Sequence, residues 1–217
     1  MLDERSSQPR REISLGFDEE LYPAGTHMCL IFGDDSERKD VLAKYVDSGL
    51  SSGEKVGYFV DTVSQQELWD EFRDLGIVGP DRPETANLEI AIAADVYCPD
   101  GTFVVERMLN TLASGYTSSM QEGFAGYRAT GEMTWSRRLD VPMDDLLEYE
   151  ARINILARTV STTAICQYDT RRFDGSTIFD ILTVHPMMIV RGQILHNPFY
   201  MQPEDFLARQ AKRRDDA

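Results

Sequence analysis

The sequence predicts an α/β protein in which a mostly parallel sheet has helices on both faces and a C-terminal antiparallel hairpin. Two observations carry this prediction. Strand-like and helix-like patterns alternate along the 217 residues, which is the chain order of parallel strands joined by crossover helices. Most of the strand-like segments are near-continuous apolar runs, as expected of strands that are covered on both faces. A chain of this length builds one large domain with a sizeable core.

The first part of the domain reads as three strands with a helix after each of the first two. Apolar residues recur at helical spacing in the first helix. The second helix begins at Ser64 with Glu67 three residues later, the signature of a capping box. The expected elements are strands at residues 27–32 (HMCLIF), 54–60 (EKVGYFV) and 88–93, and helices at residues 37–50 and 64–75.

The second part continues the alternation and ends in a hairpin with Arg191-Gly192 at its centre. Pro142 suits a first helical turn, and the helix that follows is acidic at its start and carries arginines towards its end, as the helix dipole favours. The expected elements are a helix over residues 101–120, interrupted or ended near Gly115, strands at residues 124–129 (FAGYRA) and 162–168 (TTAICQY), helices at residues 144–160 and 176–184, and the hairpin at residues 188–196.

Both ends of the chain are polar and charged. We therefore expect a disordered N-terminal tail over residues 1–16, a single domain over residues 17–208 and a charged C-terminal tail over residues 209–217.

Composition excludes several classes of function. A formal net charge of −15 and a pI near 4.6 oppose direct binding to nucleic acid and to anionic membranes. The chain has no apolar run of the roughly 18 residues that cross a bilayer and no signal-peptide core, so we expect a cytoplasmic protein. Its three cysteines, Cys29, Cys98 and Cys166, are widely spaced. We expect buried reduced thiols and neither a disulfide framework nor a CxxC metal site.

The segment after the first strand, FGDDSERK (residues 32–39), stands where a nucleotide-binding protein carries its phosphate loop. Such a loop needs several glycines and a lysine followed by serine or threonine. Here one glycine precedes two aspartates, and Lys39 precedes Asp40. We interpret the segment as a connection in which Asp35 or Ser36 caps the next helix. The sequence therefore has no intact nucleotide motif.

The histidines form no metal motif either. His27, His185 and His196 lack metal-ligand spacing, although His27 and Cys29 share one face of the first strand. Cys166 lies in a buried strand, which does not offer the base and the electropositive, partly exposed setting that a nucleophilic cysteine needs.

Polar and aromatic residues follow two of the predicted strands, where ligands of parallel sheets bind. The segment RATGEMTW places Arg128, Glu132 and Trp135 together, as in a pocket with polar groups over apolar walls. The alternative is an Arg128–Glu132 ion pair that only fixes the turn. Another strand ends in Tyr168 and Asp169, and that aspartate resembles a magnesium-holding position but suits a hydrogen bond to Arg128 or to a ligand as well.

Three further residues are candidates for the same site. Glu150 shares a helix face with Asn154, four residues later. His27 and His185 complete the set. A histidine titrates near neutral pH and suits ligand contact, whereas His185, next to Pro186, also suits a structural hydrogen bond.

Taken in order, these motifs resemble the MEDS family, the methanogen and methylotroph sensory domain also called the DcmR-like sensory domain. The resemblance covers residues 17–208. It rests on Gly25-Thr26-His27-Met28-Cys29, Gly49-Leu50, Gly53-Glu54-Lys55-Val56, Tyr97, Gly101-Thr102-Phe103, Arg128 to Trp135, Tyr149-Glu150, Cys166-Gln167-Tyr168-Asp169, His185-Pro186 and Asn197-Pro198-Phe199-Tyr200.

The resemblance implies a RecA/KaiC-like fold with a degenerate phosphate loop. It also implies a sensory role, the recognition of small hydrocarbon derivatives, in signalling proteins and transcription regulators. Family members often carry a helix-turn-helix or a kinase module, and this sequence shows neither. We therefore expect a stand-alone sensor whose output is a regulatory protein partner or a change in self-association.

Our leading hypothesis is a sensor, not an enzyme, that binds a small organic ligand at the carboxyl-end crevice of the sheet. Arg128 would hold a carboxylate or carbonyl group of the ligand, and Trp135 and Tyr168 would form apolar walls. Glu132 or Asp169 would orient Arg128 or accept a ligand hydroxyl.

Two alternatives stay open. One is a divergent KaiC-like ATPase that uses Lys39, Glu132 and Asp169. The other is an interaction module without a ligand.

Overall fold

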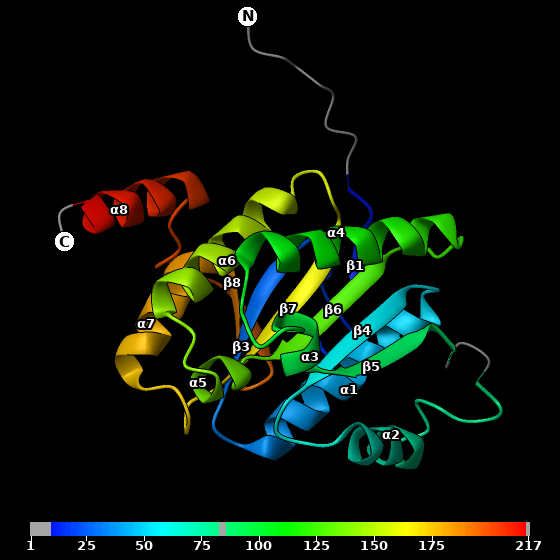
Figure 1. Ribbon diagram of the computed structural model, residues 1–217. Coiled ribbons are helices and arrows are strands. Elements are labelled where there is room, and N and C mark those ends of the chain that lie inside the picture. The colour runs from blue at the N-terminus through cyan, green and yellow to red at the C-terminus, as the bar shows by residue number, and fades with distance from the viewer. Residues whose placement is uncertain (1–9, 83–85, 216–217) are drawn as a thin grey trace, which may run out of the picture.

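The computed structural model describes residues 10–82 and 86–215 and confirms the predicted fold class (Figure 1). Seven strands form one sheet in the order β5-β4-β6-β7-β3-β8-β9. Every neighbouring pair is parallel except β8 and β9, which form the predicted hairpin. The strands are β3 (His27–Phe32), β4 (Lys55–Val60), β5 (Leu88–Ile92), β6 (Tyr127–Glu132), β7 (Thr162–Asp169), β8 (Met187–Val190) and β9 (Gln193–His196).

Helices cover both faces of the sheet. Figure 1 shows α4 and α6 across the near face and α1 behind the strands. One hydrophobic core lies between the sheet and α1 and α2, and a second lies between the sheet and the remaining helices. The first pair is α1 (Asp35–Ser51) and α2 (Gln65–Asp74); the others are α3 (Ala93–Tyr97), α4 (Val105–Gln121), α5 (Trp135–Arg138), α6 (Met143–Leu156), α7 (Gly175–Val184) and α8 (Pro203–Asp215).

Side chains alternate between the two cores along each central strand, because successive residues of a strand point to opposite faces. In β3, Met28 and Leu30 belong to the α1 core, while Cys29 belongs to the α6 core. In β7, Ile165 faces α1 and Cys166 faces α6. This alternation decides which of the predicted site residues can meet.

Local signals at two turns hold in the structure, and the predicted cap of α1 is shifted along the chain. Ser64 and Glu67 form the predicted capping box at the start of α2. Arg191 and Gly192 have φ of 52° and 71°, the positive values of a type I′ hairpin turn. The start of α1 is capped by Asp34, whose side chain accepts from the Ser36 N–H, so the predicted caps Asp35 and Ser36 were wrong by one or two residues.

Two predicted boundaries were also wrong. The strand expected at residues 124–129 is β6, which begins at Tyr127 and continues to Glu132. The helix expected over residues 101–120 is α4, which begins at Val105 and runs through Gly115 without a break. Gly115 is needed for packing here, since a Cβ at this position would lie 2.8 Å from the Tyr127 ring.

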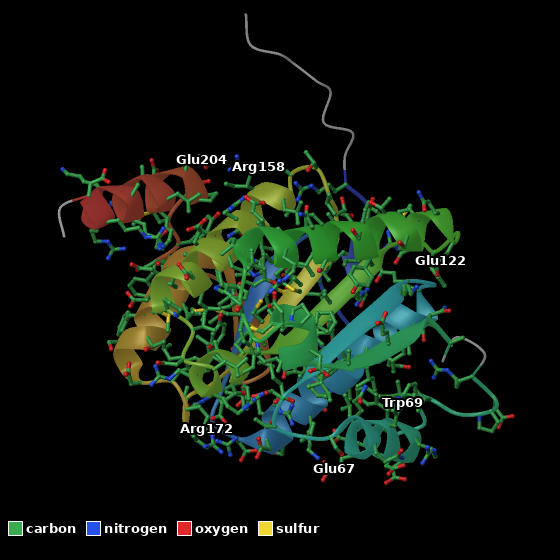
Figure 2. All side chains as sticks on the ribbon, viewed as in Figure 1. Glu67, Trp69, Glu122, Arg158, Arg172 and Glu204 are labelled. Carbon is green, nitrogen blue, oxygen red and sulfur yellow. The ribbon has the colours of Figure 1, made fainter. Side chains whose placement is uncertain are left out.

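Both ends of the domain are more ordered than expected. β1 (Glu12–Ser14) pairs with β2 (Leu21–Pro23) in an antiparallel hairpin, inside the stretch predicted as a tail. At the other end α8 continues through Asp215. Arg158, after α6, forms an ion pair with Glu204 that fastens the start of α8 (Figure 2). Across the described residues, helices that combine the length and the apolarity needed to cross a bilayer are absent.

Candidate functional site

The sheet divides the residues predicted for the ligand site. His27, Glu150, Tyr168 and His185 come together under α6 and α7. Arg128 and Glu132 lie on the α1 side, Asp169 lies at the end of β7, and Trp135 lies in an aromatic cluster.

Arg128 is enclosed by protein partners. Its side chain is fully buried, and its Nε donates to Glu54. Its Nη1 donates to the Tyr45 carbonyl at 3.2 Å and its Nη2 to the Ser14 carbonyl at 2.8 Å. Gly49 leaves it room, since a Cβ there would lie 3.0 Å from Arg128 Cδ. The guanidinium therefore ties β1 and α1 to the sheet, and neither predicted partner, Glu132 or Asp169, contacts it in the described structure.

The carboxyl-end crevice is filled by ion pairs. Glu132 accepts from Arg38 Nη1 at 3.2 Å and from the Thr62 N–H at 2.7 Å. Asp169 accepts from Arg171 Nε at 2.8 Å, and the same arginine reaches Asp35 at 2.7 Å. Glu132 and Asp169, the two carboxylates predicted at the strand ends, are thus each neutralised by an arginine of the chain.

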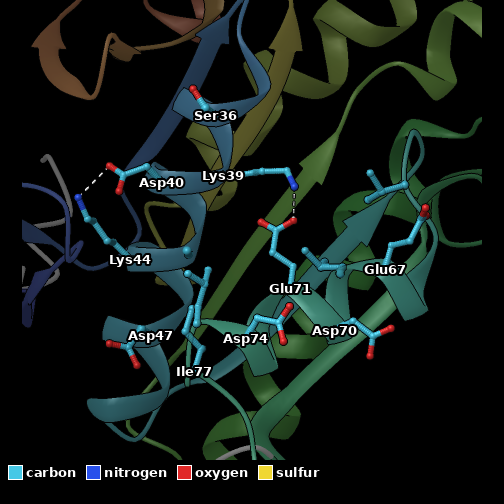
Figure 3. Close-up of a pocket in the computed structure, with 14 residues that line it drawn as sticks. Ser36, Lys39, Asp40, Lys44, Asp47, Glu67, Asp70, Glu71, Asp74 and Ile77 are labelled. Atoms are coloured by element: carbon cyan, nitrogen blue, oxygen red, sulfur yellow. Dashed lines mark hydrogen bonds and ion pairs between the residues drawn. The ribbon is translucent and has the colours of Figure 1, made fainter.

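Lys39, the cation of the ATPase alternative, also has a protein partner. Its Nζ lies 2.7 Å from Glu71 in a groove of about 920 Å³ between α1 and α2 (Figure 3). Lys44 pairs with Asp40 in the same groove at 2.8 Å. The carboxylates that line it, Asp40, Asp47, Glu67, Asp70, Glu71 and Asp74, outnumber these two lysines. Such a surface disfavours a polyphosphate.

Trp135 is buried among aromatic rings. It stacks on Tyr97 with ring centroids 4.5 Å apart, and Phe103 lies 5.2 Å away. Tyr149 meets the Tyr97 ring edge-on at 5.9 Å. The Trp135 Nε1–H has no hydrogen-bond partner among the described residues. A buried space of about 10 Å³ next to Tyr97 and Tyr149 extends to Cys166 of β7.

Cys166 belongs to a polar cluster with His27, Glu150 and His185, and all four side chains are buried. Glu150 Oε2 lies 3.1 Å from His27 Nε2, 3.4 Å from His185 Nε2 and 3.3 Å from Cys166 Sγ. Cys166 Sγ lies 3.5 Å from His27 Nε2. We call these four residues the His-Glu-Cys cluster.

Four different elements supply the His-Glu-Cys cluster. His27 begins β3 and Cys166 lies in β7, on the face towards α6. Glu150 lies in the middle of α6, and His185 is the C-cap of α7. Parallel pairing of β3 with β7 places His27 opposite Ala164, next to Cys166. The cluster therefore joins two central strands to the two helices that cover them.

Neighbouring groups fix the orientation of each side chain. The Asn154 amide donates to the Glu150 and Val184 carbonyls, so its Oδ1 is left to accept from His27 Nδ1 at 3.2 Å. The Ile181 carbonyl, 2.9 Å away, accepts from His185 Nδ1. In the neutral imidazoles both Nε2 atoms then carry lone pairs that point at the carboxylate of Glu150.

Burial controls the ionisation of these groups. It lowers the pKa of His27, and the nearby charge of His185 lowers it further. Burial would raise the pKa of Glu150, but the interactions with His185 and His27 outweigh it and hold that pKa below its usual range. Burial and then the Glu150 charge raise the pKa of Cys166 well above its usual range. In the absence of a bound cation, Cys166 is a thiol and donates a hydrogen bond to Glu150. The Tyr168 hydroxyl also donates to Glu150.

Sequence reasoning found part of this cluster. It singled out His27, Glu150, Tyr168 and His185 but assigned them to the crevice at the carboxyl ends of the strands. Cys166 was expected to be a buried reduced thiol, as it is, but its position beside Glu150 was not foreseen. Asn154 was visible as the i+4 partner of Glu150, although its bond to His27 requires the fold. The signal for Cys166 was its alternation with Tyr168, which puts both on one face of β7.

One family model matches most of this chain. The family model described as MEDS, the methanogen/methylotroph, DcmR sensory domain, matches residues 26–186. The transcriptional repressor DcmR of Methylorubrum extorquens is 22% identical over 173 residues, which cover 73% of this chain and 57% of the repressor. The chain thus spans little more than half the length of that curated relative.

Solved structures share the fold. A KaiC-like protein of Pyrococcus horikoshii superposes with a TM-score of 0.58 at 15% identity, covering 84% of this chain and 81% of the other. The flagellar accessory protein FlaH of Methanocaldococcus jannaschii superposes with a TM-score of 0.52 at 14% identity, covering 88% and 89%. The architecture is therefore KaiC-like.

Proposed function

The chain belongs to the MEDS family of sensory domains, and on that premise we propose that it binds a small organic molecule and reports its presence to a partner protein. The resemblance described above implies a ligand derived from a small hydrocarbon. The similarity to a transcriptional repressor supports a regulatory output. We place the protein in the cytoplasm, in keeping with its three buried free thiols.

The observation that carries the proposal is the meeting of a buried, mostly apolar space with the His-Glu-Cys cluster. Phe59, Tyr97, Leu112 and Tyr149 line the space, and Cys166 belongs to both. Aromatic and aliphatic walls with a few convergent polar groups are the usual composition of a small-molecule site. This place replaces the carboxyl-end crevice as our preferred ligand site, since the polar groups at that crevice already pair with one another.

The size of the space suggests how binding would be transmitted. Its volume of about 10 Å³ accommodates about one water molecule. A larger ligand would fit only after α4 or α6 moves away from the sheet, so it would favour the displaced state by its differential affinity. Because α6 packs against α8 and the Arg158–Glu204 pair joins them, the movement would alter the surface around α8. A partner protein, or a second copy of the chain, would then bind this surface more tightly or more weakly.

Native mass spectrometry of protein purified from its own host tests the proposal first. We expect a retained small molecule. Thermal shifts with short-chain alcohols, aldehydes, carboxylates and halocarbons then identify its class. Absence of both a retained molecule and any shift would contradict ligand sensing.

A cavity-filling variant tests the place. Ala129 lines the buried space, so Ala129→Val should abolish binding of the identified molecule. Ala43→Val is the control, because Ala43 lies on the opposite side of the sheet beside the α1–α2 groove. If Ala129→Val is folded and binds the molecule as tightly as the wild type, the ligand site lies elsewhere.

The ATPase alternative is tested in the same thermal-shift format. A nucleotide at about 100 times its Kd stabilises a protein by about 2.7 kcal/mol. Because Lys39, Glu132 and Asp169 are all paired within the chain, we expect no shift with magnesium and ATP. A shift that Lys39→Ala removes would favour the ATPase.

A further inference from the structure

We propose that His27, Glu150, Cys166 and His185 bind one divalent transition-metal ion, zinc by preference, between the sheet and helices α6 and α7. The family resemblance predicted an organic ligand and the sequence showed no metal motif, so this inference rests on the three-dimensional cluster alone. It goes beyond the proposed sensing of a small molecule and does not depend on it.

Four of the six separations between the ligand atoms are close to those around a tetrahedral ion, and the other two are at most 4.8 Å. Zinc lies about 2.0–2.1 Å from histidine nitrogen and about 2.3 Å from cysteine sulfur. Tetrahedral ligands at these bond lengths are about 3.3–3.7 Å from one another. The measured separations from Glu150 Oε2 are 3.1, 3.3 and 3.4 Å, and that between His27 and Cys166 is 3.5 Å. All the candidate ligand atoms lie within 4.8 Å of one another.

The tautomers supply a second, independent argument. His27 and His185 each donate Nδ1–H to an oxygen, of Asn154 and Ile181 respectively. In the neutral imidazoles, both Nε2 lone pairs then face Glu150. His185 Nε2 is fully buried and makes no hydrogen bond within the described parts of the chain. A cation at the centre would satisfy these lone pairs and the carboxylate at once.

The outer contacts are those of a metal site. Metal-bound histidines almost always donate their other ring N–H to a carbonyl or carboxylate, and metal-bound carboxylates are themselves hydrogen-bonded. The two histidines have such acceptors, and Glu150 Oε1 accepts from the Tyr168 hydroxyl. Each oxygen and nitrogen ligand is therefore held in the orientation that an ion would need.

Charge balance favours a divalent ion at this depth. On binding, the Cys166 thiol loses its proton to solvent, one sulfur–hydrogen bond breaks and one sulfur–metal bond forms, with no change of oxidation state. The thiolate and the Glu150 carboxylate then neutralise the two positive charges of the ion. A neutral complex avoids the cost of a buried net charge.

The chemistry of the donors narrows the choice of ion. Two imidazoles and one thiolate suit zinc, cobalt, copper or iron, whereas magnesium and calcium prefer oxygen ligands. Four protein ligands complete a tetrahedron, as in structural zinc sites. We therefore expect the ion to fasten α6 and α7 to the sheet.

The competing explanation is a proton-sharing network with no ion. In that case one or both imidazoles would carry a second proton and donate to Glu150, and Cys166 would remain a thiol. The two explanations differ in metal content and in the state of the Cys166 sulfur.

The test uses the full chain with any affinity tag removed, purified without chelator. Elemental mass spectrometry should find one zinc ion per chain. After removal of that ion, titration with Co²⁺ should produce a thiolate-to-cobalt charge-transfer band in the near ultraviolet and intense visible bands of tetrahedral cobalt. The wild type alone decides the outcome: no bound zinc and no charge-transfer band on cobalt addition would overturn the proposal.

Matched cysteine variants identify the sulfur. Cys166→Ser should lose the charge-transfer band, whereas Cys29→Ser should keep it, because Cys29 is buried on the same face of the neighbouring strand but lies outside the cluster. Asn154→Leu should weaken metal affinity by about 10- to 100-fold through the loss of the His27 orientation. An equal loss of the band in both cysteine variants, with circular dichroism showing both folded, would contradict the assigned ligand set.

Discussion

Replacing Arg128 by methionine separates the structural from the ligand-binding interpretation of this residue. The guanidinium is fully buried against Glu54, which keeps only 2% of its side chain exposed. Removing one partner of a buried ion pair costs about 3–5 kcal/mol, because the other charge stays buried without compensation. Arg11 also contacts Glu54, but its side chain is 39% exposed, so it offsets only part of the loss.

Urea unfolding measures the effect. For an m value of about 2 kcal/mol per molar urea, a loss of about 4 kcal/mol lowers the midpoint by about 2 M. Arg158→Met is the matched control, since its ion pair with Glu204 lies at the surface and such pairs contribute about 0–1 kcal/mol. The double variant Arg128→Met with Glu54→Leu should recover much of the stability, because it removes both buried charges.

The same protein samples test the ligand-binding interpretation. If Arg128→Met changes the free energy of unfolding by less than about 1 kcal/mol, the structural reasoning fails. If it also releases an organic molecule that the wild type retains, Arg128 belongs to the ligand site after all.

Two further predictions concern the His-Glu-Cys cluster. Because the pKa of His27 is lowered on folding, the unfolded chain binds more protons at this position between the folded value and about 6.5. The free energy of unfolding, measured in EDTA, should therefore fall as the pH drops below about 6.5. His27→Gln should flatten this pH dependence, whereas the control His196→Gln should leave it unchanged. An identical pH dependence in the wild type and in His27→Gln would refute this prediction. Tyr168→Phe removes the hydroxyl that donates to Glu150 and should lower the free energy of unfolding by about 1.5–3 kcal/mol; a change below about 0.5 kcal/mol would show that the Tyr168 hydroxyl bond is not needed.

The fold was predictable because its signals are local. The apolar runs of β3 and β7 are buried on both faces, so they read as strands of a parallel sheet without further information. The capping box at Ser64 and the turn at Arg191-Gly192 each depend on residues within a few positions. The failed prediction at Gly115 involves a distant contact. The Tyr127 ring, twelve positions later, occupies the space that a side chain at position 115 would need, so this glycine serves packing and does not mark the end of α4.

The site was only half predictable for a related reason. The alternation along a strand shows that Arg128 and Glu132 share one face of β6, and that Cys166 and Tyr168 share one face of β7. The alternation does not show whether the β6 face with Arg128 and the β7 face with Cys166 lie on the same side of the sheet. Pairing of Arg128 with Thr163 in the register of β6 and β7 puts Arg128 on the opposite side from Cys166. A site assembled from strand ends alone therefore mixed residues from both sides of the sheet.

The two faces of the sheet now suggest different uses of one KaiC-like architecture. On the α1 face, Arg38 with Glu132 and Lys39 with Glu71 satisfy charges that would otherwise meet a phosphate. On the α6 face, Trp135 Nε1 and His185 Nε2 lack hydrogen-bond partners among the described residues, and His185 Nε2 lies within a cluster of ligand-type atoms that joins four elements. Recognition on the α6 face would act directly on α6 and, through it, on α8. A sensor with this fold and no nucleotide chemistry needs a link between ligand binding and the position of α6. If α6 were held to the sheet only by apolar contacts that a ligand leaves unchanged, binding would not shift its position and no signal would reach α8.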